Sequence, residues 1–266
     1  MASVEDLRTD LSAEQTALDS MLGLLKPADW DRDTPAEGWT IKDTISHLAF
    51  YDEAATVAVE EPDLFEESLE MIEADIQAFL DEPLERGRAM TPDEVQDWWW
   101  ESRNDMLLAF ETLEEGQRVK WYGPSMSAAS FITARLMEVW AHGQDIADAM
   151  NLHRRPTDRL KHVAHIGIKA LPFSFANNGL APPSEDVSVR LTSHIGEVWS
   201  WGTSRDDRVS GSAEDFCLVV TQRRHVDDTD LVVEGPVARR WIDIAQAFAG
   251  PPGKGRRPGQ FPKRHA

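Results

Sequence analysis

Residues 135–150 read RLMEVWAHGQDIADAM, and this stretch decides the fold because it mixes ionisable and apolar side chains at helical spacing. On a helical wheel at about 100° per residue, Glu138, His142 and Asp145 fall within about 60° of arc. Their stripe borders the apolar face, where a carboxylate is costly unless it is paired or bound to a metal. The stretch therefore predicts a buried helix that carries a polar site.

A second stretch, residues 38–55, reads GWTIKDTISHLAFYDEAA. Thr40 and Asp43 have the spacing of a capping box, which predicts that a helix begins there. On the wheel of this helix, His47 points toward the core together with small and aromatic side chains. The side chains expected on the opposite side of this helix are Lys42, Ser46 and Glu53.

Three inward donors on two helices, His47, Glu138 and His142, form a set that suits a catalytic divalent metal with one position open. The donor set does not fix the metal, because zinc, nickel, iron and manganese all accept these ligands. Asp145 is placed to orient a histidine ligand. Two alternatives remain: an inward histidine is often a hydrogen-bonded core residue, and a glutamate and a histidine at i, i+4 can simply pair with each other.

Helical periodicity with matching caps and breaks predicts a four-helix bundle in the first part of the chain. The expected long helices are 3–26, 40–60, 91–115 and 126–150, with a shorter one at 64–80. We expect this metal-binding bundle to occupy residues 1–152.

Beyond the bundle the periodicity changes to a mixture of helices and short strands, which predicts a smaller α+β domain over residues 153–250. The expected elements are helices at 158–176, 212–224 and 236–250, and strands at 187–193, 197–203 and 229–235. Residues 251–266 are rich in glycine, proline and basic residues, and we expect them to be a disordered tail.

The formal net charge is −20, which argues against binding to nucleic acid or to anionic membranes. The only cysteine, Cys217, lies in an apolar run and is expected to be a buried, inert thiol. No signal peptide or membrane-spanning run is evident. We therefore expect a cytoplasmic protein, and the sequence leaves its oligomeric state open.

The two motifs in 38–55 and 135–150 resemble the mycothiol-dependent maleylpyruvate isomerase family of the DinB/YfiT-like metalloprotein superfamily. The closest resemblance is to an actinobacterial branch whose C-terminal part is labelled a wyosine-base-formation domain. It implies a DinB-like four-helix bundle in which zinc is held by His47, Glu138 and His142. It also implies a C-terminal α+β domain similar to sterol-carrier proteins, with a catalytic arginine at the position of Arg223; Arg224 is the alternative.

The function that this resemblance implies is a zinc-dependent thiol transferase or cis–trans isomerase, with mycothiol as cosubstrate. Its other substrate is expected to be a small carboxylate or electrophile, because a guanidinium such as that of Arg223 grips carboxylates well. The alternative is a non-catalytic protein that binds a metal or a small apolar ligand. A role in tRNA modification is a third reading, and the charge of −20 counts against it.

Overall fold

The computed structural model describes residues 2–261, which form two compact units that are divided between Arg154 and Arg155. The first unit is mainly helical, and the second combines helices with a four-stranded sheet. The predicted class, α plus α+β, is therefore confirmed. Each unit is described below by itself.

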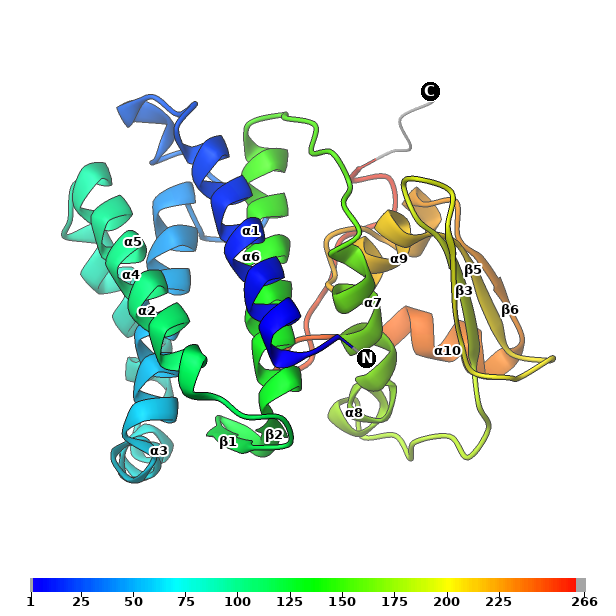
Figure 1. The fold of residues 1–266 in the computed structure, drawn as a ribbon. Helices are drawn as coiled ribbons and strands as arrows, with labels where there is room; N and C mark the ends of the chain where they lie inside the picture. Colours follow the sequence, from blue (N-terminus) through cyan, green and yellow to red (C-terminus); the bar gives the residue numbers. More distant parts are fainter. Residues whose placement is uncertain (1, 262–266) are drawn as a thin grey trace. The chain divides into compact units, whose positions relative to one another are not determined.

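Four long helices and two shorter ones build the first unit, together with a small β-hairpin (Figure 1). Their bounds are α1 Val4–Leu22, α2 Ile41–Glu60, α3 Pro62–Ala74, α4 Ile76–Arg88, α5 Pro92–Ala109, β1 Arg118–Trp121, β2 Gly123–Ser127 and α6 Ala128–Ala149, with 3-10 turns η1 Pro27–Asp29 and η2 Phe110–Thr112.

The long helices pack in pairs, α1 against α6 and α2 against α5, and α2 also contacts α6. Their shared interior is fully buried at Leu11, Ile45, Trp99 and Phe131, one residue from each of the four helices. Burial of large apolar side chains from all four helices is the main force that holds such a bundle together. The contact between α2 and α6 brings the two sequence motifs close to each other.

Two segments of this unit differ from the prediction. The single helix expected at 64–80 is two helices, because Asp75 ends α3 and its carboxylate accepts the backbone N–H of Ala78 to cap α4. The segment expected to be a loop before the last helix contains the antiparallel hairpin β1–β2. Its strands are four and five residues long and mostly exposed, so no alternating apolar pattern indicates them.

The second unit places helices on one face of a mixed sheet (Figure 1). In the sheet, β3 and β5 are parallel neighbours, and β4 and β6 flank them as antiparallel edge strands. The bounds are α7 Leu160–Lys169, α8 Leu171–Asn177, β3 Ser188–Thr192, β4 Val198–Trp201, β5 Arg208–Ser212, α9 Ala213–Val220, η3 Val226–Asp228, β6 Val232–Glu234 and α10 Pro236–Ile244.

The sheet alternates buried and exposed residues as a one-sided sheet should, with Val189, Leu191 and Val209 buried. The prediction did not include β5, whose run RVSGS contains one large apolar residue. The helix expected at 158–176 is divided between α7 and α8 at Ala170. Pro172 explains the division, because it has no N–H with which to continue the helical ladder.

Of the tail expected to be disordered, residues 262–266 lie outside the described residues. Residues 251–261 have no helix or strand, but their backbone N–H groups donate to side chains elsewhere in the second unit. Gly253 donates to Oε1 of Gln246 at 3.1 Å, and Gly259 donates to Oδ1 of Asp228 at 2.7 Å. Within the part of the chain that the structure describes, no helix is long and apolar enough to span a bilayer.

Candidate metal centre

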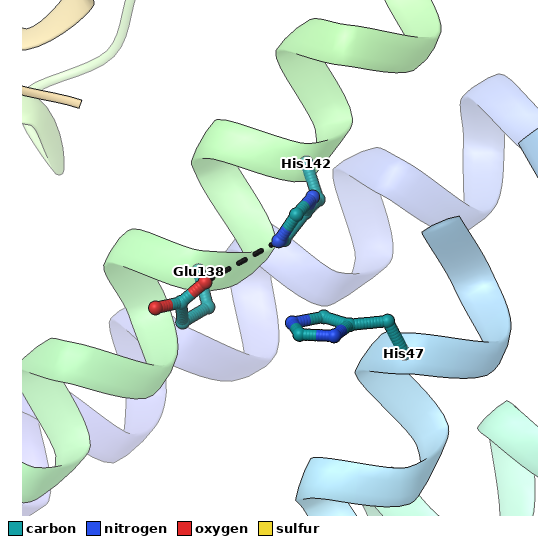
Figure 2. A group of neighbouring side chains, drawn as sticks. All are labelled: His47, Glu138 and His142. Carbon is teal, nitrogen blue, oxygen red and sulfur yellow. Dashed lines mark ion pairs between the residues drawn. The ribbon is translucent and has the colours of Figure 1, made fainter. Parts of the chain in front are cut away.

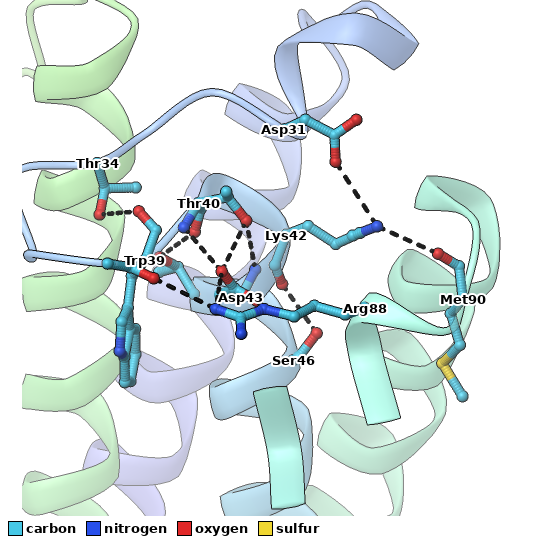
Figure 3. A network of polar contacts seen from close by, with 11 residues as sticks. Asp31, Thr34, Trp39, Thr40, Lys42, Asp43, Ser46, Arg88 and Met90 are labelled. Carbon is cyan, nitrogen blue, oxygen red and sulfur yellow. Dashed lines mark hydrogen bonds and ion pairs between the residues drawn. The ribbon is translucent and has the colours of Figure 1, made fainter. Parts of the chain in front are cut away.

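The start of α2, which sets the position of His47, is fixed by hydrogen bonds and an ion pair (Figure 3). The predicted capping box is present, because Thr40 Oγ1 accepts the N–H of Asp43 and Asp43 Oδ2 accepts the N–H of Thr40. Arg88, at the end of α4, donates to both oxygens of Asp43 at 2.9 and 3.1 Å and to the carbonyl of Gly38 at 3.2 Å. These bonds join the first turn of α2 to the end of α4, and Asp43 lies about one helical turn before His47.

The side of α2 opposite His47, where the wheel placed Ser46, is covered by α4. Ser46 is fully buried, and its hydroxyl donates to the carbonyl of Lys42 at 2.8 Å. A Cβ atom placed on Gly87 of α4 would lie 1.8 Å from the Ser46 hydroxyl oxygen, so only glycine permits this approach. The wheel gave the correct direction for His47 but could not show that a second helix packs on the opposite face.

His47 from α2 and Glu138 and His142 from α6 point toward one another (Figure 2). One donor atom from each residue lies within 4.8 Å of the other two. Nε2 of His142 is 3.4 Å from Oε2 of Glu138, and the two imidazole rings are 4.7 Å apart between centroids. The structure thus brings together the three donors that the sequence selected from two helices.

The other ring nitrogen of His142 faces Asp145. Its Nδ1 is 3.4 Å from Oδ2 of Asp145, a carboxylate with no exposed surface. A partner at Nδ1 leaves Nε2 as the atom that faces Glu138, where it can donate a proton to the carboxylate or, once deprotonated, offer a lone pair to a cation. The indole of Trp39 stacks on His142 at 5.8 Å and 11°, and it also contacts His47 at 5.0 Å. Both imidazoles are therefore held in place by aromatic packing.

The carboxyl of Glu138 is an anion at neutral pH. Burial raises its pKa, but the hydrogen bond and charge of His142, with the charges of His47 and Arg135, outweigh burial and bring the pKa to about 2. A half-buried, ionised carboxylate next to two imidazoles is a suitable environment for a cation.

Beside this group lies a buried ion pair that the sequence reasoning missed. Nε and Nη2 of Arg135 on α6 donate to Oδ1 of Asp52 on α2 at 3.2 and 2.7 Å, and both side chains are almost completely buried. Burial raises the pKa of Asp52, while Arg135 lowers it. The wheel contained the signal: Asp52 lies about 140° from His47, inside the apolar sector, and Arg135 lies about 60° from Glu138.

An aromatic cluster continues from His47 away from Trp39. The ring of Tyr51 is 4.6 Å from His47 and 5.7 Å from the ring of Tyr122, which in turn lies 4.5 Å from Trp121. Burial, followed by the charge of Glu138, raises the pKa of Tyr51 to about 12, and burial also raises the pKa of Tyr122. Both phenols are therefore protonated at neutral pH. Tyr51 shared the inward direction of His47 on the wheel, but Tyr122 lies in the hairpin that was not predicted.

The predicted catalytic arginine, Arg223, belongs to the second unit, just after α9. Its Nη1 donates to the carbonyl of Thr221 at 2.7 Å, and its guanidinium is 6.0 Å from the centre of the Phe248 ring. The neighbouring Arg224 lies over Phe261 at 4.0 Å. The roles of both arginines stay predictions. The predicted burial of Cys217 is confirmed. Its side chain is fully buried, and burial raises the pKa of its thiol well above the ordinary value.

Comparison with known proteins gives a family match over the first unit. Residues 11–147 match the family described as the mycothiol maleylpyruvate isomerase N-terminal domain. An uncharacterized protein of Mycobacterium tuberculosis, found in strains CDC 1551 / Oshkosh and ATCC 25618 / H37Rv, is 42% identical over 257 residues. That similarity covers 96% of this chain and 100% of the relative.

Among solved structures, the crystal structure of the mycothiol-dependent maleylpyruvate isomerase resembles this chain with a TM-score of 0.58 and 19% identity. A mutant of that enzyme with a histidine-to-alanine substitution gives the same TM-score at 18% identity. Both alignments cover 89% of this chain and 99% of the other. At this level of identity, the match is evidence for a shared fold.

Proposed function

Because the chain belongs to the family of the mycothiol maleylpyruvate isomerase N-terminal domain, we propose that it is a divalent-metal-dependent enzyme that uses a low-molecular-weight thiol. Mycothiol is the proposed thiol, zinc is the proposed metal, and cis–trans isomerisation or S-transfer is the proposed reaction. The observation that carries the proposal is the convergence of His47, Glu138 and His142 from two helices on one point.

The three side chains fit such a metal by type and by spacing. Two donors on one tetrahedral zinc ion lie about 3.3 Å apart, and the His142–Glu138 separation is 3.4 Å. Two imidazoles and one carboxylate also leave a coordination position for a ligand from solution. A divalent cation bound there stabilises the thiolate form of a thiol at neutral pH, which supplies a sulfur nucleophile.

The residues around the triad have supporting roles in this proposal. Asp145 holds His142 with Nε2 directed at the site, and Trp39 covers both imidazoles and excludes water from that side. Glu138 supplies a negative charge without having to release a proton at neutral pH. We also propose that Arg223 grips a carboxylate of the substrate, with Arg224 as the alternative.

Metal analysis of the purified protein tests the site. We expect close to one equivalent of divalent metal in the wild type, and a loss in His47→Ala and in His142→Ala. His153→Ala is the matched control, because His153 is an exposed histidine of the same unit, and it should keep its metal. Equal metal content in all four proteins would show that these two histidines are not ligands.

Thiol use is tested with the metal-loaded protein. Mycothiol should raise the melting temperature in proportion to the logarithm of its concentration, and the metal-free protein should not respond. Maleylpyruvate, which the related enzyme is named for, is the first substrate to test; conversion to its trans isomer should require both mycothiol and metal. Metal-loaded protein with no response to millimolar mycothiol would refute thiol use and favour a non-catalytic metal-binding role.

A further inference from the structure

The chain contains two tyrosines in 266 residues; Tyr51 lies beside the triad, and Tyr122 packs against Tyr51. Tyr51 follows His47 by one helical turn on α2, so the two side chains share a face, and their rings are 4.6 Å apart. Tyr122, in the hairpin, meets Tyr51 edge-on with 5.7 Å between ring centres. The hydroxyl of Tyr51 is also within electrostatic reach of the Glu138 carboxylate.

The hydroxyl groups of the two tyrosines have no hydrogen-bond partner within the described part of the chain. A half-buried tyrosine hydroxyl usually has a hydrogen-bond partner. Here the hydroxyls of Tyr51 and Tyr122 make no hydrogen bond with a described residue, and neither is among the fully enclosed polar atoms that lack a partner. Both hydroxyl oxygens therefore keep some exposed surface, through which a ligand can reach them. Trp98 shows the contrast, since its indole N–H donates to Glu53 at 2.6 Å.

We propose that the hydroxyl of Tyr51 is a hydrogen-bond donor to the substrate, and that its acceptor is the carbonyl oxygen conjugated to the reacting carbon–carbon double bond. This inference rests on the proposed function. The donor is used most when the oxygen gains charge, which happens as the thiol sulfur adds to the double bond.

The electrons of this reaction balance without another reactant. A sulfur lone pair forms a C–S bond, and the π electrons of the double bond move through the conjugated system to the carbonyl oxygen, giving an enolate. Rotation about the resulting single bond follows. The enolate electrons then reform the double bond and expel the thiolate, so that the thiol is regenerated and the alkene is trans. Tyr51 stabilises the enolate by hydrogen bonding and keeps its own proton.

Neighbouring rings make this hydrogen bond more effective. Phe79 and Trp121 lie edge-on to Tyr51 at 6.0 and 6.4 Å, and Tyr122 lies between them. These rings surround the ring of Tyr51 with apolar groups and lower the local dielectric constant, and a hydrogen bond to developing charge is worth more where the dielectric constant is low. Flat ring surfaces also favour a planar, conjugated substrate.

The test compares Tyr51→Phe with Tyr122→Phe in the full-length, metal-loaded protein, because each change removes one oxygen atom and keeps the ring. With mycothiol and maleylpyruvate, Tyr51→Phe should lower kcat about 10- to 100-fold. It should also weaken binding of succinylpyruvate, the saturated analogue that cannot isomerise, about 3- to 10-fold by calorimetry. Metal content should not change, and Tyr122→Phe should lose less in both assays.

Four outcomes would overturn the inference: unchanged kcat and analogue affinity in Tyr51→Phe, loss of metal in that variant, an equal or larger loss in Tyr122→Phe, or no analogue binding to the wild type. Failure of the proposed function has a different signature, in which the wild type binds the analogue but does not isomerise maleylpyruvate. In that case the analogue affinities of the wild type and Tyr51→Phe decide the inference on their own, and equal affinities overturn it.

Discussion

The buried ion pair between α2 and α6 provides the most direct test of how this bundle is held together. Arg135 donates two hydrogen bonds to Oδ1 of Asp52, with 4% and 0% of the two side chains exposed. Arg135→Met removes the cation and keeps most of the side-chain volume. It leaves the carboxylate of Asp52 buried without a counter-charge.

The expected loss of unfolding free energy is about 3 to 5 kcal/mol, the usual cost of removing one partner of a buried pair. The control is Glu111→Ala. Glu111 pairs with Arg8 at the same 2.7 Å distance, but 26% of the Arg8 and 59% of the Glu111 side chain is exposed, so its loss should cost about 0 to 1 kcal/mol. The double variant Asp52→Val/Arg135→Met, which replaces both charges with apolar groups, should cost only about 0 to 2 kcal/mol.

Urea unfolding followed by tryptophan fluorescence measures these differences, because seven of the ten tryptophans lie in the first unit. Burial raises the pKa of Asp52, so in Arg135→Met the carboxylate of Asp52 can be neutralised by protonation. The deficit should therefore be largest near neutral pH and shrink as the pH falls toward the pKa of an unfolded aspartate. A deficit no larger than that of Glu111→Ala, or one that does not depend on pH, would refute this reasoning.

Three further predictions follow from the titrating groups of the metal-free protein. The pKa of Tyr51 is raised to about 12 and that of Tyr122 is also raised, so tyrosinate absorbance should be absent at pH 10 to 10.5 and begin to develop only near pH 12; because the unfolded chain releases its tyrosyl protons from about pH 10, stability should fall as the pH rises above that value. Glu138 has a lowered pKa of about 2, so its contribution to stability is complete above the ordinary glutamate pKa and is lost as the pH falls toward 2; the difference in urea midpoint between wild type and Glu138→Gln should disappear over that range. Cys217 should react with a thiol reagent only after unfolding, because burial suppresses its thiolate, and rapid labelling of the native protein would contradict this.

Local sequence signals predicted the elements that carry the site. Thr40 and Asp43 cap α2 as their spacing indicates, and Thr91 caps α5 in the same way, because capping depends on residues within one turn. The wheel also selected His47, Glu138 and His142, since two amphipathic helices of one bundle must turn their apolar sides to a common interior.

Features that depend on contacts between distant segments were not predictable in this way. Burial of Ser46 requires the close approach of α4 at Gly87, and Tyr122 reaches the site only because the hairpin folds back on α2 and α3. Asp52 and Arg135 carry opposite charges in apolar sectors of two helices. That pattern predicts pairing only once α2 and α6 are known to be neighbours.

The ion pair and the triad occupy the same two helices, and this has a consequence for the carboxylate of the site. Arg135 precedes Glu138 by three residues on α6, a spacing at which a cation and an anion commonly pair with each other. Asp52 accepts the guanidinium instead. The charge of Arg135 lowers the pKa of Glu138, but its hydrogen-bond donors are directed at Asp52. Glu138 thus keeps its oxygen atoms for His142 and, in the proposed function, for the metal. Without Asp52, the guanidinium of Arg135 would lack its acceptor and could donate to Glu138 instead. In the proposed function, a metal would then compete with Arg135 for the Glu138 carboxylate. The fold therefore places the aspartate that stabilises the α2–α6 contact where it also keeps the site's carboxylate available.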